Sequence, residues 1–254
     1  MMADFDINEI IAFNTNAACL MVQGDENKAQ QALRETLDAL VGLLGSLQEE
    51  ANEMDLEEMM MMAVDDEASH QQTLRFLSVQ QLQKHGEEDS PSRTPQGGVL
   101  ELFRKVVHVH CPTPPVEAEG IPWNSQIELA VSVLYNAGLF FHMKAVNIGK
   151  EVFLQKSIKY YTVAYEMITL WRYHESDMNL LLAIAILNNL AHAHFMLGNM
   201  SHSFEIFQEV KNVFLVAMTS PNAQVQAWDA DVVDFAILTL SVASPNSFAI
   251  ASAA

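Results

Sequence analysis

The sequence predicts a mostly α-helical protein built of antiparallel helical hairpins, with a possible short two-stranded β element. Three observations predict this class. Half of the 254 residues are hydrophobic and only 18% are charged, which is ample apolar material for a core. Apolar residues recur at helical spacing before residue 48 and again between residues 125 and 220. One valine-rich stretch, 98–110, lacks that spacing and favours a strand.

The N-terminal region, residues 1–48, has the pattern of a helical hairpin. A first helix is expected over Ile7–Val22, and it ends before Gly24, a residue that readily adopts the left-handed conformation after a helix. Asp25 can cap a second helix that runs to about Leu47. The two apolar faces consist of Ile10, Phe13, Ala17 and Leu20 in the first helix, and of Ala29, Leu33, Leu37, Leu40 and Leu44 in the second.

Residues 49–97 form an acidic, methionine-rich region that we expect to be a linker, partly helical or disordered. It contains 12 of the 32 acidic residues. A run of methionines, Met59–Met62, lies among these acids and offers an alternative role as an adaptable docking segment. A short helix is expected over Ser69–Lys84, followed by a loop rich in Gly, Pro and Ser.

Residues 98–124 combine a strand-like segment with a proline-rich loop. A single strand cannot satisfy its own backbone groups, so the strand needs a partner. The best candidate is the β-prone stretch 232–242, within a C-terminal region, 221–254, that we expect to be a helix or strand and a tail.

Residues 125–220 predict two further helical hairpins. Consecutive helices with such short joints pack antiparallel. The four expected helices are Ser125–Ile148, Lys150–His174, Asp177–Leu197 and Met200–Met218.

The first and last hairpins share one internal spacing. A small residue is followed after seven residues by a turn glycine and after twelve by a second small residue, as in Ala17, Gly24, Ala29 and in Ala191, Gly198, Ser203. In the middle hairpin, the two small residues, Gly138 and Ser157, are nineteen positions apart. Its excess of seven residues corresponds to about one extra turn in each helix.

This pattern resembles the tetratricopeptide repeat (TPR), in which small residues let two helices approach closely and large residues fill the gaps. The layout is also similar to that of algal proteins with degenerate repeats of this kind. The resemblance implies an α-solenoid-like fold that binds a polypeptide partner in a groove lined by the first helix of each hairpin. The implied groove residues are Asn14, Tyr135, Leu139, His142, Asn188, His192 and Phe195. Alternatively, these side chains pack against the strand pair or the N-terminal hairpin.

No catalytic, cofactor-binding or metal-binding residues are expected. The HExxH, Walker and GxSxG motifs are absent, and Glu67–His70 is the single Glu-x-x-His pair. His108 and His110, followed by Cys111, could contribute to a metal site, but the sequence shows no third convergent ligand. The expected function is therefore a non-enzymatic protein-interaction scaffold. The alternatives are a helical-bundle enzyme with metal-dependent chemistry and an architectural subunit of an assembly.

The net charge of −19 argues against nucleic acid and anionic membranes as partners. The sequence shows no signal peptide, no run of about 20 apolar residues and only two cysteines, which favours an intracellular location, cytoplasmic or nuclear. The expected partner is a protein or peptide, and the oligomeric state stays open. One basic concentration could dock an acidic partner segment or the chain's own acidic region, or could be a solvated helix face: Lys144, Lys150, Lys156, Lys159 and Arg172.

Overall fold

The computed structural model describes residues 7–53, 73–78, 102–110, 123–170 and 177–219. The described residues form six helices and two strands, so the mostly α-helical class is confirmed. The chain divides into two compact units. The first combines Met1–Gln80 with Lys105–Ala137, and the second combines Gln81–Arg104 with Gly138–Ala254.

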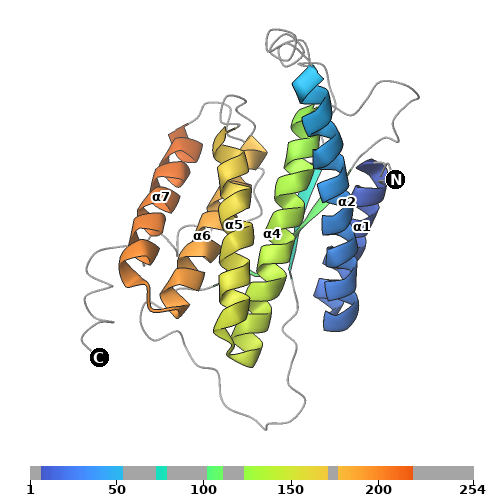
Figure 1. Ribbon diagram of the computed structural model, residues 1–254. Helices are drawn as coiled ribbons and strands as arrows, with labels where there is room; N and C mark the ends of the chain where they lie inside the picture. Colours follow the sequence, from blue (N-terminus) through green and yellow to red (C-terminus); the bar gives the residue numbers. More distant parts are fainter. Residues whose placement is uncertain (1–6, 54–72, 79–101, 111–122, 171–176, 220–254) are drawn as a thin grey trace, which may run out of the picture. The chain divides into compact units, whose positions relative to one another are not determined.

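In the first unit, helices α1 (Ile7–Gln23) and α2 (Glu26–Glu53) pack side by side as the predicted antiparallel hairpin (Figure 1). The chain reverses at Gly24, whose φ is 77°. The Gly24 N–H donates to the Met21 carbonyl (3.2 Å), and the Asp25 N–H donates to the Leu20 carbonyl (3.0 Å). These two bonds form a Schellman motif, which satisfies the last carbonyls of α1.

The second helix of this hairpin begins as the sequence predicts. The Asp25 carboxylate accepts a hydrogen bond from the Lys28 N–H (3.2 Å), which is the bond of an N-terminal cap. The Asp25 side chain also forms an ion pair with the Lys28 ammonium at 2.7 Å. The Lys28 side chain is exposed and the Asp25 side chain is partly exposed, so the pair adds little to stability.

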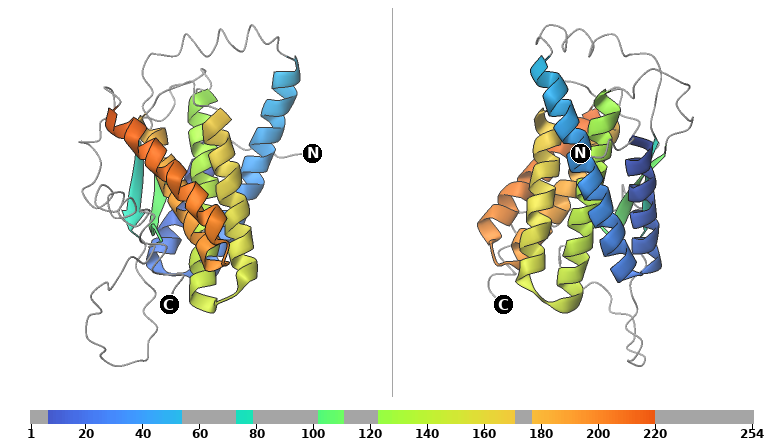
Figure 2. Two further views of the ribbon diagram at one scale, coloured as in Figure 1. Left: turned by 90° about the vertical axis from the view of Figure 1, so that its left-hand side faces the viewer. Right: turned by 45° about the vertical axis from the view of Figure 1, so that its right-hand side comes forward.

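Strands β1 (Thr73–Ser78) and β2 (Lys105–His110) pair antiparallel, with Phe76 opposite Val107. Both strands contact α1 (Figure 2). The predicted helix over Ser69–Lys84 is wrong where the structure describes it, because this segment donates and accepts its backbone hydrogen bonds in a ladder with β2. A short run of apolar residues does not distinguish a helix from a strand by periodicity alone.

Several sequence predictions fall outside the described residues. The structure does not describe the C-terminal region 221–254. This region includes the stretch 232–242, the predicted partner of the strand. Of the acidic region 49–97, the structure describes the end of α2 and strand β1.

Helix α4 (Trp123–Ile148) begins two residues before the predicted cap, Ser125. The boundary between the two units falls within α4, between Ala137 and Gly138. Every residue from 129 to 140 is buried, so this part of the helix has no solvent-facing side. Contrary to the sequence-based expectation, Gln126–Ile148 is long and apolar enough to cross a membrane, but 72% of its most apolar window is buried within the fold. Such burial is typical of a core helix.

The second unit continues with α5 (Glu151–Leu170), α6 (Asp177–Met196) and α7 (Met200–Thr219). In Figure 1, α6 lies between α5 and α7, and it contacts both. All residues from 181 to 191 in α6 are buried, so α6 is the central helix of this unit. The predicted helices are confirmed to within a few residues, apart from 171–174, which the structure does not describe.

The turn between α6 and α7 repeats the hydrogen bonds of the first hairpin. Gly198 has a φ of 78°, and its N–H donates to the Phe195 carbonyl (2.9 Å). The Asn199 N–H donates to the His194 carbonyl (2.9 Å), which completes a second Schellman motif.

The close crossing predicted for the third hairpin is present. The Ser203 hydroxyl of α7 donates to the Ala191 carbonyl of α6 at 2.8 Å, and both residues are buried. A side-chain oxygen reaches the facing helix backbone only where both residues are small. The predicted spacing of twelve residues therefore corresponds to a contact between the two helices.

The middle hairpin absorbs its extra residues in the helices. Its turn glycine, Gly149, has a φ of 73° and donates to the Ala145 carbonyl (2.7 Å). From Gly138 to Gly149 is eleven residues, four more than in the third hairpin, and from Gly149 to Ser157 is eight, three more. The excess of seven thus divides into about one turn per helix, as predicted. A Cβ atom at Gly138 would lie 2.6 Å from Cε1 of Tyr161, so only glycine fits at this crossing.

Candidate functional site

In the first unit, side chains of α1 and α4 bind the main chain of β2. Asn136 Oδ1 accepts from the Val107 N–H (2.8 Å), and Asn136 Nδ2 donates to the Val107 carbonyl (2.7 Å). The second amide proton of Asn136 is directed to Asn14 Oδ1 (3.0 Å), and Asn14 Nδ2 in turn approaches the Val107 carbonyl at 3.5 Å. Both asparagines are fully buried. The Asn136 amide therefore uses both of its donors and its acceptor.

A tyrosine binds the same edge of the strand. The Tyr135 hydroxyl donates to the Lys105 carbonyl at 2.8 Å. Lys105 and Val107 are two residues apart, so their backbone groups point to the same side of β2. Since β1 pairs with the opposite edge, Tyr135 and Asn136 occupy hydrogen-bonding positions that a third strand would otherwise fill.

The second unit uses the same contact at another helix. Asn189 Oδ1 of α6 accepts from the Phe103 N–H (2.9 Å), and Asn189 Nδ2 donates to the Phe103 carbonyl (3.0 Å). Asn188 Nδ2 and the Tyr161 hydroxyl lie 3.2 and 3.4 Å from the Asn189 amide. Asn189, like Asn136, binds both the N–H and the carbonyl of a single residue.

The two asparagines occupy equivalent positions in their hairpins. Asn136 lies two residues before Gly138, and Asn189 lies two residues before Ala191. Gly138 and Ala191 are the small residues of the helix crossings. The repeat pattern therefore includes two kinds of residue. Small residues pack the hairpin, and an asparagine two positions earlier hydrogen-bonds to main chain.

The second unit also holds a pair of histidines. His142 Nε2 of α4 and His192 Nδ1 of α6 lie 2.9 Å apart, so one of these nitrogens donates to the other. His142 is fully buried beside the Tyr161 ring, and its Nδ1 has no hydrogen-bond partner among the described residues. Burial lowers the pKa of His142 well below its ordinary value, and positive charge on His192 and Arg104 lowers this pKa further. His142 is therefore neutral at physiological pH.

The free energy of unfolding is expected to fall as the pH drops below 6.5. Because the pKa of His142 is below its ordinary value of 6.5 in the folded state, the unfolded chain binds more protons in this range. The contribution is fully present above pH 6.5 and decreases on acidification by at most about 1.4 kcal/mol per pH unit for one proton. Chemical denaturation between pH 7.5 and 5.5 measures this slope.

His142→Gln is the informative variant for this slope, since it keeps a polar atom beside His192 but removes the titration. It is expected to flatten the pH dependence and to leave a smaller part that His194 contributes, because burial and His202 also lower the pKa of His194. An equal slope in the wild type and in His142→Gln would contradict the assignment to His142.

The structure buries most of the predicted groove residues. Asn14 and Tyr135 meet at β2 in the first unit, and His142 meets His192 in the second. Leu139 and Asn188 are buried, while His192 and Phe195 are half-buried. In this conformation a partner would reach Asn14 and Tyr135 only after β2 has left.

Asn136 and Asn189 were not among the predicted site residues. Each follows a predicted groove residue directly, and each lies in a helical stretch that is rich in apolar residues. The recurrence of Asn two positions before both small residues is the signal that could have identified them. Buried asparagines require hydrogen-bond partners, so such a recurrence predicts a shared polar contact.

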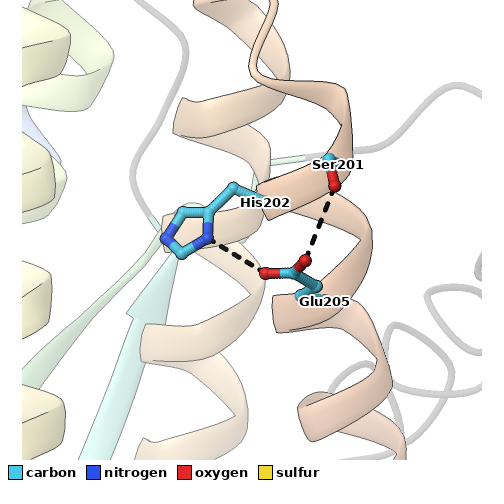
Figure 3. Close-up of polar contacts among 3 residues, drawn as sticks. All are labelled: Ser201, His202 and Glu205. Carbon is cyan, nitrogen blue, oxygen red and sulfur yellow. Dashed lines mark hydrogen bonds and ion pairs between the residues drawn. The ribbon is translucent and has the colours of Figure 1, made fainter.

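Figure 3 shows a Ser–His–Glu group in the first two turns of α7. The Ser201 hydroxyl lies 3.5 Å from Glu205 Oε1, and His202 Nδ1 lies 3.3 Å from Glu205 Oε2. The carboxylate therefore stands between the hydroxyl and the imidazole. A nucleophilic serine needs the base at its own oxygen, so this arrangement does not activate Ser201. All three residues are exposed, as expected for polar contacts within a helix end.

Within the described residues, no three His, Cys, Asp or Glu side chains gather as a metal site would require. The side chains of His108 and His110, and Cys111 itself, lie outside what the structure describes. The pair Glu67–His70 also lies outside it.

Comparison with known proteins adds no assignment. No family model, no curated protein and no solved structure matches this chain.

Proposed function

We propose that this protein is a non-enzymatic, TPR-like scaffold that binds an extended polypeptide partner on its helix faces. The observation that carries the proposal is the contact of Asn136 with both the N–H and the carbonyl of Val107. These main-chain groups are present in almost every residue, so the contact does not depend on the side chain that is bound. A helix face that binds an extended main chain can accept a segment of another protein in the same way.

The neighbouring side chains support this proposal. Tyr135 adds a hydrogen bond to Lys105, two residues earlier along the same strand edge. The first unit therefore binds the main chain of alternate residues of an extended chain, Lys105 and Val107. The side chains of Val106 and Val107 are fully buried, which favours a bound segment with two adjacent apolar residues. The repeated Schellman turns at Gly24 and Gly198 support the TPR-like reading of the hairpins.

In the structure, the chain's own residues Lys105–Val107 occupy this face. A partner would therefore bind by replacing β2. A tethered segment competes at a high effective concentration, of about millimolar for a short flexible linker. The free protein is then expected to bind an external peptide weakly until its own strand is weakened.

A labelled peptide with the sequence of residues 101–112 tests this proposal. Its binding to the full chain is followed by fluorescence anisotropy, with the wild type compared with the Val106→Ala, Val107→Ala double variant. The double variant loses buried side chains from its own strand, so it is expected to bind the peptide about tenfold more tightly or better. The own strand of the double variant is expected to have left the face, so adding Tyr135→Phe removes only the hydrogen bond to the peptide main chain and is expected to weaken binding about threefold to tenfold.

Val41→Ala is the matched control, because Val41 is 70% exposed on α2 and makes no part of this face. It is expected to bind the peptide as weakly as the wild type. Circular dichroism shows whether each variant keeps its helices. Two results would overturn the proposal: the folded double variant fails to bind the peptide, or the addition of Tyr135→Phe leaves its affinity for the peptide unchanged.

A further inference from the structure

A row of aromatic rings joins α4 to α5 in the second unit. The Phe141 ring stacks with the Phe153 ring (centroids 6.3 Å apart, planes at 17°) and with the Tyr160 ring (5.7 Å, 4°). All three side chains are half-buried, so part of each ring reaches the surface. Burial also raises the pKa of the Tyr160 hydroxyl. The row is an apolar ridge with one side open to solvent.

Two lysine ammonium groups lie over these rings. Lys144 Nζ is 5.3 Å from the centroid of Phe153, and Lys156 Nζ is 5.2 Å from that of Phe141. Cations at this distance are attracted to the faces of aromatic rings. The rings therefore keep the two ammonium groups close to the apolar surface.

An exposed stripe of α5 continues this surface. Val152, Lys156, Lys159 and Val163 follow at intervals of four, three and four residues, so they share one face of the helix. All four are exposed, with Val152 at 50% and Val163 at 44%. The stripe thus presents two ammonium groups between two apolar side chains. Together with the aromatic row and Lys144, it is called here the lysine–aromatic face.

The charge of this face opposes that of the rest of the chain. Residues 139–163 contain four lysines and one acidic residue, Glu151, in a chain with a net charge of −19. An acidic ligand is attracted locally, but the remaining charge repels extended polyanions such as nucleic acid or an anionic membrane. A short acidic segment avoids most of that repulsion.

We propose that the lysine–aromatic face docks an acidic amphipathic helix of another protein. Glutamate or aspartate side chains of the partner would pair with Lys156 and Lys159. Its apolar side chains would cover Val152, Val163 and the aromatic edges, where leucine and methionine pack well. This surface and its ligand differ from the main-chain contact at Asn136, so this inference does not depend on the proposed function.

The test uses a fluorescent 18-residue peptide with glutamates on one helical face and leucine and methionine on the other. Its affinity for the full chain is measured by anisotropy at low salt. The Lys156→Gln, Lys159→Gln double variant is expected to lose about tenfold in affinity, and added salt is expected to weaken wild-type binding. Lys211→Gln, an exposed lysine of α7, is the matched control and is expected to change the affinity less than about twofold.

Four other outcomes would overturn the proposal. The acidic peptide fails to bind, or a peptide with lysine in place of every glutamate binds equally well. Vesicles of phosphatidylserine and phosphatidylcholine bind with the same dependence on Lys156 and Lys159, which would make the face a membrane contact. Alternatively, the peptide binds only after the chain's own acidic residues 55–67 have been neutralised, which would make that segment the occupant.

Discussion

Replacing Asn136 by alanine is expected to lower the free energy of unfolding by about 2–5 kcal/mol. The substitution leaves the N–H and the carbonyl of Val107 without the Asn136 amide in a fully buried position. Each buried polar group that loses its partner costs about 1–3 kcal/mol. Urea denaturation of the full chain, followed by circular dichroism at neutral pH, measures the loss.

Two further substitutions separate the Val107 contact from general effects of changing an asparagine. Asn14→Ala removes only the longer contact of 3.5 Å and one hydrogen bond to Asn136, so a smaller loss is expected. Asn16→Ala changes an exposed residue of α1 and should stay within about 0.5 kcal/mol of the wild type. If Asn136→Ala behaves like Asn16→Ala, the amide does not hold the strand.

Replacing Ala191 by leucine is expected to destabilise the protein by about 1–3 kcal/mol. Ala191 is fully buried at the crossing of α6 and α7, where its carbonyl accepts the Ser203 hydroxyl at 2.8 Å. Three added carbon atoms cannot fit without moving one helix or breaking that hydrogen bond. Overpacking of a dense core costs this amount because neighbours must leave their preferred rotamers. The denaturation midpoint reports the change.

Ala12→Leu provides the matched control for this prediction. Ala12 is an exposed residue of α1, so the same chemical change there meets solvent instead of a facing helix. It is expected to alter the free energy of unfolding by less than about 0.5 kcal/mol. An unchanged midpoint for Ala191→Leu would show that this position is not the closest contact of the hairpin.

The helical hairpins could be predicted from the sequence because their signals are local. Apolar periodicity placed α5, α6 and α7, and glycines marked the turns at Gly24 and Gly198. The spacing from Gly138 to Ser157 predicted one extra turn per helix without any knowledge of the packing. Each of these features depends on residues close together in the chain, whose positions follow from helix geometry.

The candidate site could be predicted only in part. The sequence predicts Asn14 and Tyr135 as groove residues, and both bind β2, but it leaves open whether a partner or the protein's own strand covers them. It does not identify Asn136, which makes the shorter contact with Val107. Its partner Val107 lies 29 residues earlier in the chain. Helical and strand periodicities relate residues only a few positions apart, so they give no information about this contact.

The strand pair shows the same limit. The segment 73–78 has apolar residues that suit either a helix or a strand, and its pairing with Lys105–His110 decides between them. The helices, their turns and the small residues at the crossings follow from the local sequence, since these features depend on spacing within about 20 residues. Which buried polar side chains meet which backbone groups becomes known only from the folded arrangement. Hydrogen bonds between distant segments depend on how those segments pack, and local spacing does not encode that packing.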